Sequence, residues 1–129
     1  MVLSGNPWRR MASLMQRGDL VWVDLDPTQP SEANARRPAV VVSNDGANRT
    51  AEQLGRGVIT VVPVTTNTSR VYPFQVLLPV ERCGLKHPSK AQAEQIRSVS
   101  IGRVGHVVGR LPPDLIERLD RAIRLHLAL

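Results

Sequence analysis

The sequence predicts an α+β domain in which one helix lies against a small, strongly curved sheet. Short apolar and β-branched runs separated by turn residues fill most of the chain, and one amphipathic segment follows them. A helix that closes a series of strands buries its apolar stripe against their sheet, which defines this class. The 129 residues are enough for one domain with a substantial core.

The first three strands are predicted at residues 20–25, 38–43 and 58–64. The first ends at the turn signal Asp26-Pro27, and the second runs into Asn44-Asp45-Gly46. The third is almost continuously apolar, as a central strand is. Pro63 has no N–H to donate, so we expect it at a bulge or at the strand end. The polar segment 44–57 is predicted as a loop with a short helical turn around Glu52.

Three shorter strands are predicted at residues 72–80, 94–99 and 104–108. In the first of them the side chains alternate, so that one face holds Phe74, Val76 and Leu78. Gln75 lies on the other face of that strand, and Phe74 is expected to belong to the core.

The clearest helix is predicted at residues 112–129. Two prolines begin it, and apolar residues recur at spacings of three and four. This apolar stripe consists of Ile116, Leu119, Ile123 and Leu127. On the outer face, Glu117 with Arg121 and Asp120 with Arg124 have the spacing of ion pairs within a helix.

The first fifteen residues are predicted to form a loose tail (1–15) before a single domain (16–129). They hold charged residues and a proline but no sustained apolar run, so they do not read as a secretory signal. No apolar run in the chain approaches the length of a membrane span. One cysteine, Cys83, cannot form an intrachain disulfide, which suits a reducing cytoplasm; we expect it to be an inert thiol.

The net charge of +6 and the pI near 11.0 indicate an anionic partner. The predicted helix carries three acidic and three basic residues, so the whole excess of charge lies before it. A nucleic-acid-binding face is therefore expected on the sheet and its loops. A basic surface that serves only solubility is the alternative.

The stretch SEANARRPAVVVSND at residues 31–45 is the one that the sequence indicates as the functional centre of the chain. Pro38 keeps Arg37 out of helical geometry and holds it at the start of a core strand, five residues after the carboxylate of Glu32. Loops carried on a rigid sheet are where binding and catalysis concentrate. A surface ion pair flanking a structural strand is the equally open interpretation.

Five segments resemble the MazF/PemK family in their order and approximate spacing. They are RGDLVWVDLDP (17–27), RRPAVVVSND (36–45), VVPVTT (61–66), YPFQVLL (72–78) and AEQIRSV (93–99). With the closing helix, the resemblance extends over roughly residues 17–127. Each segment alone can occur in any strand-rich domain, but five in register are specific.

The resemblance implies a small SH3-like barrel with a C-terminal helix, the fold of the CcdB and MazF toxins, paired as a homodimer. Members of the family are cytoplasmic toxins of type II toxin–antitoxin modules that inhibit translation and growth. They cut single-stranded RNA at short sequences without a metal or another cofactor. A cognate antitoxin, which is MazE-like and binds through an acidic disordered segment, neutralises them.

The resemblance also implies three catalytic positions. Arg37 matches the arginine that precedes the strand proline, Thr65 the threonine that closes the third strand, and Glu32 the acidic residue of the first long loop. Pro30 stands where the family often has the glycine of a Gly-Ser-Glu loop, so loop flexibility and the cleavage sequence are expected to differ.

The chemistry of metal-free RNA cleavage fits these residue types. It needs an acceptor for the proton of the ribose 2′-hydroxyl and donors for the phosphorane oxygens. Arg37 offers a planar fork for the phosphate and is never deprotonated, so it is expected to stabilise charge. Thr65 can donate a further hydrogen bond, although a hydroxyl that bonds only backbone is the structural alternative. Glu32 is the candidate base if burial raises its pKa.

Other catalytic machinery is less well supported by the sequence. His87, His106 and His126 are scattered, and nothing places any of them beside Arg37. Asp24 and Asp26 carry oxygen ligands suited to Mg²⁺, but turn chemistry explains them, so no metal site is predicted.

Substrate contacts are predicted at exposed polar and basic residues outside the helix, with Lys86 and Lys90 as further phosphate contacts and Tyr72 as a stacking partner. The predicted substrate-binding residues are Ser31, Arg36, Ser43, Asn44, Thr66, Arg70, Gln95, Arg97 and Ser98. A second function class stays open, namely a non-catalytic toxin of the same fold that poisons DNA gyrase as CcdB does. The segments RRP and VPVTT favour the nuclease.

Overall fold

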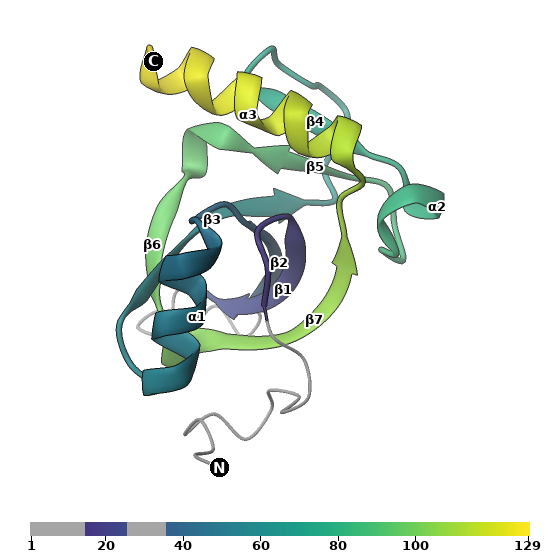
Figure 1. Ribbon diagram of the computed structural model, residues 1–129. Helices are drawn as coiled ribbons and strands as arrows, with labels where there is room; N and C mark the ends of the chain where they lie inside the picture. The colour runs from purple at the N-terminus through teal and green to yellow at the C-terminus, as the bar shows by residue number, and fades with distance from the viewer. Residues whose placement is uncertain (1–14, 26–35) are drawn as a thin grey trace.

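The computed structural model describes residues 15–25 and 36–129, which form a seven-stranded antiparallel sheet with a long C-terminal helix (Figure 1). The strands are β1 (Asp19–Asp24), β2 (Arg36–Val41), β3 (Val58–Thr65), β4 (Gln75–Leu78), β5 (Ser89–Gln92), β6 (Arg97–Ser100) and β7 (Val104–Arg110). The helices are α1 (Asp45–Leu54), α2 (Val80–Cys83) and α3 (Pro113–Leu127), with short 3₁₀ helices η1 (Ala93–Gln95) and η2 (Ile101–Arg103). The predicted class, α+β with an antiparallel sheet and a terminal helix, is confirmed.

β3 is the central strand of the sheet. The strand order is β4-β5-β3-β2-β1-β7, and β6 also pairs with β3. Along its first half β3 bonds β6, from Val58 opposite Ser100 to Val61 opposite Arg97, and at its end it bonds β5. The strands curve strongly around the interior (Figure 1). Pairings among the described strands do not join β4 to β7, so closure into an SH3-like barrel stays a prediction.

Both faces of the sheet are buried, and each carries its own core. Even-numbered residues of the central strands, Val40 and Val62 among them, join the core under α3, while Ala39, Val41 and Val61 join a second core on the other face. This double burial explains why β2 and β3 are continuously apolar rather than alternating. Cys83 lies in the first core, and burial raises the pKa of its thiol, as expected for an inert cysteine.

The C-terminal helix packs against β4 and η1, and its buried face differs from the predicted stripe. Leu115, Leu119 and Ala122 are buried, whereas Ile116 and Ile123 are only half-buried and Leu127 is exposed. The prediction was right for Leu119 and partly right for Ile116 and Ile123, which pack at the edge of the first core, and wrong for Leu127, because the last leucines of α3 are uncovered. No helix among the described residues is long and apolar enough to cross a membrane.

Of the two ion pairs predicted on this helix, one forms. Arg121 pairs with Glu117 one turn away. Asp120 instead binds Arg17, at 2.6 Å between Nη2 and Oδ1, and the same arginine donates from Nε to the carbonyl of Val42. Arg17, which is distant in the sequence, therefore takes the place of Arg124 as the partner of Asp120.

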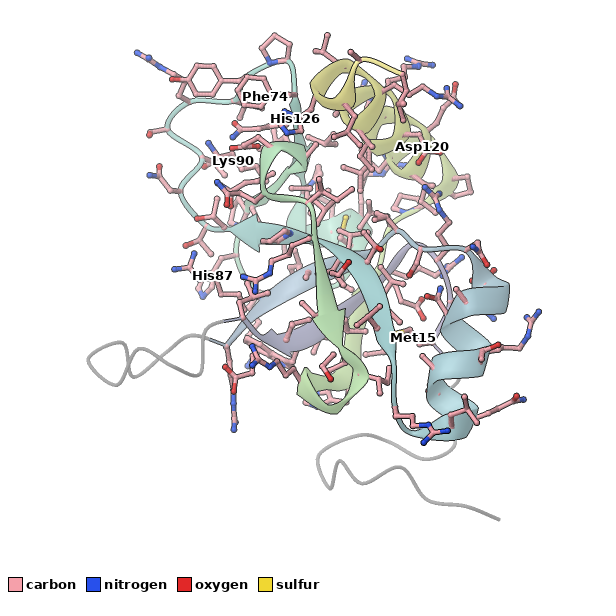
Figure 2. The ribbon with its side chains drawn as sticks, turned by 90° about the vertical axis from the view of Figure 1, so that its left-hand side faces the viewer. Met15, Phe74, His87, Lys90, Asp120 and His126 are labelled. Carbon is pink, nitrogen blue, oxygen red and sulfur yellow. The ribbon has the colours of Figure 1, made fainter. Side chains whose placement is uncertain are left out.

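The polar segment after β2 forms a three-turn helix rather than a loop with one short turn. Asn44 caps α1, since its side chain accepts a hydrogen bond from the N–H of Ala47, and Gly55 ends the helix with φ 65°. Glu52 accepts a hydrogen bond from the backbone N–H of Met15. Met15, where the predicted tail meets the domain, is itself buried in the second core, beside α1 in Figure 2.

The remaining differences lie in the second half of the sheet. The predicted strand 72–80 is reduced to β4. Gln75 lies on the other face from Val76 and Leu78, as predicted, and is buried there. The predicted strand 94–99 divides into η1 and β6, and β5 was not predicted at all. Pro63 lies within β3, where it faces Ala39 of β2, so the strand continues through the proline.

One surface ion pair gives a pH-dependent contribution to stability. Arg82 of α2 binds Asp114 of α3 through two hydrogen bonds of 2.7 and 2.8 Å, which lowers the pKa of the Asp114 carboxyl. A carboxyl with a lowered folded-state pKa stabilises the fold above its unfolded-state pKa, and this contribution is lost as the pH falls through the folded-state value. We expect Asp114→Asn to lower the melting temperature slightly at pH 7 and to leave it unchanged near pH 2. Thermal melts of both proteins at the two pH values measure this, and a difference that persists at pH 2 would contradict it.

Candidate nucleic-acid cleavage site

Three polar side chains lie at one level of the sheet, on neighbouring strands. β2 and β3 pair with Ala39 opposite Pro63, and continuing this register by two residues sets Arg37 opposite Thr65. On the other edge of β3, Thr65 pairs with Lys90 of β5. Opposed residues of antiparallel strands direct their side chains to the same face. Arg37, Thr65 and Lys90, here called the polar row, therefore share one face at one end of the sheet.

The hydroxyl of Thr65 is oriented by the backbone that follows it. Thr65 Oγ1 accepts a hydrogen bond from the N–H of Asn67 at 3.2 Å, and the side chain is half-buried. This backbone bond is the structural alternative predicted from the sequence. In this bond Thr65 Oγ1 is only the acceptor, so the hydroxyl proton of Thr65 is still available for donation to a substrate.

Arg37 is exposed at the start of β2. Its neighbour Pro38 is half-buried and pairs with Trp22 of β1, which fixes the backbone at this point. Arg36, which also belongs to β2 and is exposed, pairs with Asp24 and lies on the opposite face of the strand. Only one of the two adjacent arginines therefore points to the face of Thr65.

The loop between β3 and β4 brings a cation and an aromatic pair next to the polar row. Arg70 donates from Nη1 to the hydroxyl of Tyr72 at 3.1 Å. The ring of Tyr72 stacks on Phe74 with centroids 5.3 Å apart, and the Lys90 ammonium lies 6.0 Å from its centre. The prediction that Phe74 belongs to the core was wrong, since it is half-buried and forms the support of this stack. Thr66 is exposed at the start of the loop.

Residues of β6 and η1 lie further along the same edge of β3. Arg97 pairs with Val61 and Ser98 with Thr60, and all three predicted contacts there (Gln95, Arg97 and Ser98) are exposed. Val61 is four residues from Thr65, which is about 13 Å along a strand. The backbone positions of Arg97 and Ser98 therefore lie well away from Thr65, which suits contacts with neighbouring nucleotides.

Two predicted substrate contacts are engaged elsewhere in the structure. Ser43 donates to the side chain of Asn48 at 2.5 Å and accepts from the N–H of Thr60, while Asn44 caps α1. Both lie six or more residues beyond Arg37, about 20 Å along β2. The structure does not bring them to the polar row.

Some predicted positions cannot be placed. Ser31 and Glu32 lie outside the described residues, so the candidate base has no geometry here. Within residues 15–25 and 36–129, no cluster of three or more His, Cys, Asp and Glu side chains has the arrangement of a metal site. His87, His106 and His126 are all exposed, and His87 lies in the turn before β5.

Lys90 is the member of the polar row whose placement the sequence did not indicate. It was one of several basic residues considered as phosphate contacts, in a stretch expected to be a loop. The structure buries it in β5, only 7% exposed. The short sequence Ser-Lys-Ala-Gln has no β-branched residue, so local propensity gave no signal for the strand.

Solved structures with the same fold define the class of protein. A mycobacterial endoribonuclease solved in complex with its cognate antitoxin superposes with a TM-score of 0.71 at 22% identity, covering 89% of this chain and 96% of that one. MazF from Deinococcus radiodurans gives a TM-score of 0.69 at 26% identity, covering 91% and 99%. The fold is therefore that of the MazF-type toxins.

Sequence relatives then identify the family. The chain is 58% identical over 116 residues to endoribonuclease MazF9 of Mycobacterium tuberculosis, covering 90% of this chain and 98% of the relative. It is 41% identical over 83 residues to the endoribonuclease toxin MazF of Escherichia coli K12, covering 64% of this chain and 66% of that protein. Residues 16–127 match the PemK-like, MazF-like toxins of type II toxin–antitoxin systems. The chain belongs to this family, which confirms the predicted resemblance.

Proposed function

We propose that this protein is a sequence-specific, metal-independent endoribonuclease that acts as the toxin of a type II toxin–antitoxin module. The observation that carries the proposal is the pairing of Ala39 with Pro63, because this register, extended by two residues along β2 and β3, would set Arg37 opposite Thr65 on one face. The relatives named as endoribonucleases support the activity class. Cleavage of mRNA by such an enzyme would inhibit translation and growth in the cytoplasm.

In the proposed reaction the 2′-oxygen of a ribose bonds to the adjacent phosphorus, and the bond from phosphorus to the 5′-oxygen breaks. The products are a 2′,3′-cyclic phosphate and a 5′-hydroxyl. Arg37 holds two phosphate oxygens through its planar fork, and Thr65 donates to the same group. These contacts stabilise the negative charge that develops in the transition state.

Proton transfer is assigned to a different residue. The guanidinium of Arg37 stays protonated throughout, so it cannot accept the proton of the 2′-hydroxyl. Glu32, five residues before Arg37, is the proposed base. It takes the proton from the attacking hydroxyl, and a water molecule gives a proton to the departing 5′-oxygen.

Single-stranded RNA is proposed to lie across the face of the polar row. Arg70, Tyr72 and Thr66 lie on the loop beside Thr65, while Gln95, Arg97 and Ser98 are set for neighbouring nucleotides. Unstacked bases bind on aromatic rings and arginine planes, and the stacked pair of Tyr72 and Phe74 offers such a surface. Ser31, in the loop before β2, and Arg36, on the other face of that strand, are proposed to contact neighbouring nucleotides rather than the cleaved phosphate.

The experiment that tests the function is cleavage of a mixed pool of single-stranded RNA by the purified protein in the presence of a chelator. We expect cuts at one short sequence, with a cyclic phosphate and a 5′-hydroxyl at the new ends. Intact RNA together with a DNA-damage response on expression would instead support the gyrase poison. Cleavage that requires a divalent cation would refute the metal-independent mechanism.

The proposed protein partner is a cognate MazE-like antitoxin with an acidic segment. The mycobacterial structure is a complex with its cognate antitoxin, and a Deinococcus radiodurans structure is a MazE–MazF complex. Because the excess positive charge of this chain lies outside α3, an acidic segment is attracted to the sheet face that also attracts RNA. Competition for this face would explain neutralisation.

The face of α3 and β4 is proposed to bind a second copy of the chain. A groove of about 360 Å³ runs there, lined by Val71, Pro73, Gln75, Val76, Leu77, Arg118, Arg121, Ala122 and Leu125. Leu77 is 45% exposed and Leu125 is 58% exposed, which is unusual for leucines that cluster together. The charges of α3 sum to zero, so two such faces can meet without net repulsion.

We expect Leu125→Asp to convert the dimer into a monomer, because a charged carboxylate would replace an apolar side chain and lose its hydration at the interface. Light scattering during gel filtration measures the mass. Leu54→Asp is the matched control, since Leu54 of α1 is equally exposed and lies away from the groove. A dimer that survives Leu125→Asp would place the interface elsewhere.

A further inference from the structure

Lys90 is a buried cation with an incomplete set of partners. Its side chain is 7% exposed, and its ammonium donates to the carbonyl oxygen of Arg70 at 2.6 Å. Among residues 15–25 and 36–129, no carboxylate forms an ion pair with it. A buried ammonium costs free energy unless a negative charge compensates it. A bound anion would therefore stabilise this buried ammonium.

The position of this cation points to the anion. Lys90 pairs with Thr65 across β3 and β5, on the edge of β3 opposite to Arg37. Neighbouring strands lie about 4.8 Å apart. The backbones that carry Arg37 and Lys90 are therefore about 10 Å apart, with Thr65 on the strand between them. Figure 2 shows Lys90 between Phe74 and His87 on one side of the molecule, close to the aromatic stack.

We propose that Lys90 supplies a second cation to the cleavage site, on the other side of Thr65 from Arg37. Its fixed charge stabilises the negative charge that develops on the scissile phosphodiester. The Arg70 carbonyl holds the ammonium in place before the substrate arrives, so little reorganisation accompanies the reaction. Burial weakens screening by water and strengthens the effect of the charge. The inference rests on the proposed nuclease function.

Two roles of Lys90 must be separated, because the same ammonium also anchors the loop that carries Arg70 and Tyr72. Three substitutions do this. Lys90→Arg keeps both the charge and a donor for the Arg70 carbonyl, Lys90→Gln keeps only a donor, and Lys90→Met keeps neither. Arg49→Met is the matched control, because Arg49 is an exposed cation on α1 that belongs to no proposed contact.

The measurements are kcat on a short cleavable RNA and Kd for the same RNA with a 2′-deoxyribose at the cut site. We expect Lys90→Gln and Lys90→Met to lower kcat by about tenfold to a hundredfold, as loss of one preorganised charge does, while Kd changes less. Lys90→Arg should restore most of the activity, and Arg49→Met should leave kcat unchanged. Circular dichroism melts confirm that each variant is folded, and Lys90→Met is expected to be the least stable because the Arg70 carbonyl loses its donor.

Each other outcome overturns the inference. If Lys90→Gln is as active as Lys90→Arg while Lys90→Met is not, the residue only anchors the loop. If all three variants match the wild type, or if all three lose activity equally, its charge has no role. Should Lys90→Met fail to fold, the comparison of Lys90→Gln with Lys90→Arg still decides. Intact RNA with the wild-type protein would reject the nuclease function itself, whereas failure of the variants alone would not.

Discussion

Replacing Arg37 with alanine is expected to lower kcat for RNA cleavage by about 10²- to 10³-fold, the usual cost of removing one charge-stabilising donor. The guanidinium is exposed, so its loss should leave the fold intact. The effect is expected mainly in kcat, since the charge that Arg37 stabilises is greatest in the transition state. Single-turnover cleavage of a labelled RNA measures it directly.

Arg36→Ala is the matched control for this substitution. Arg36 has the same charge and a similar exposure, but its side chain belongs to the other face of β2. It should weaken RNA binding modestly and leave kcat within about threefold, as expected for a contact that acts equally on substrate and transition state. Equal losses in the two variants would mean that net charge, rather than the position of Arg37, determines activity.

Gly109→Ala is expected to destabilise the fold by about 3 kcal/mol, at the upper end of the usual cost of overpacking. A Cβ at this position would lie 2.0 Å from the carbonyl oxygen of Cys83 and 3.4 Å from Leu20 Cδ1. The obstacle is backbone at the end of α2, so it cannot rotate away as a side chain would. Denaturant unfolding, with the slope unchanged and the midpoint lowered, measures the loss.

Gly102→Ala serves as the comparison, because no atom lies within 4 Å of a Cβ added there. Its free energy of unfolding should change by less than about 0.5 kcal/mol, as for most surface substitutions. A small effect of Gly109→Ala would show that α2 can move away from β7. In that case the close approach of the two backbones is not required for stability.

The sequence predicted those parts of the fold in which local pattern and tertiary packing agree. β1, β2, β3 and α3 were recognised because long apolar runs or a helical spacing identify them without knowledge of their neighbours. The helix α1 was missed because Gly46, Asn48 and Thr50 are poor helix formers. The sequence features that do indicate this helix are the cap residues at its two ends, Asn44 and Gly55.

The site was predictable only in part, for a related reason. Arg37 and Thr65 were found from their places at strand ends and from the resemblance to a family. Lys90 depends on the pairing of β5 with β3, and pairing between distant segments leaves no trace in local sequence. Ser43 and Asn44 show a further limit of local sequence, because serine and asparagine bond the backbone and cap helices as readily as they bind a ligand.

The central position of β3 couples the reaction to the core. Valines fill both cores along this strand and Thr65 is its last residue, so a slip of one residue would turn the hydroxyl away and expose the valines to water. Sliding of strands is therefore not available as a means of regulating this enzyme. An inhibitor must therefore cover the face of the polar row or displace one of its side chains. A change in the RNA sequence that is cut must come from substitutions of side chains, because the strand register stays fixed.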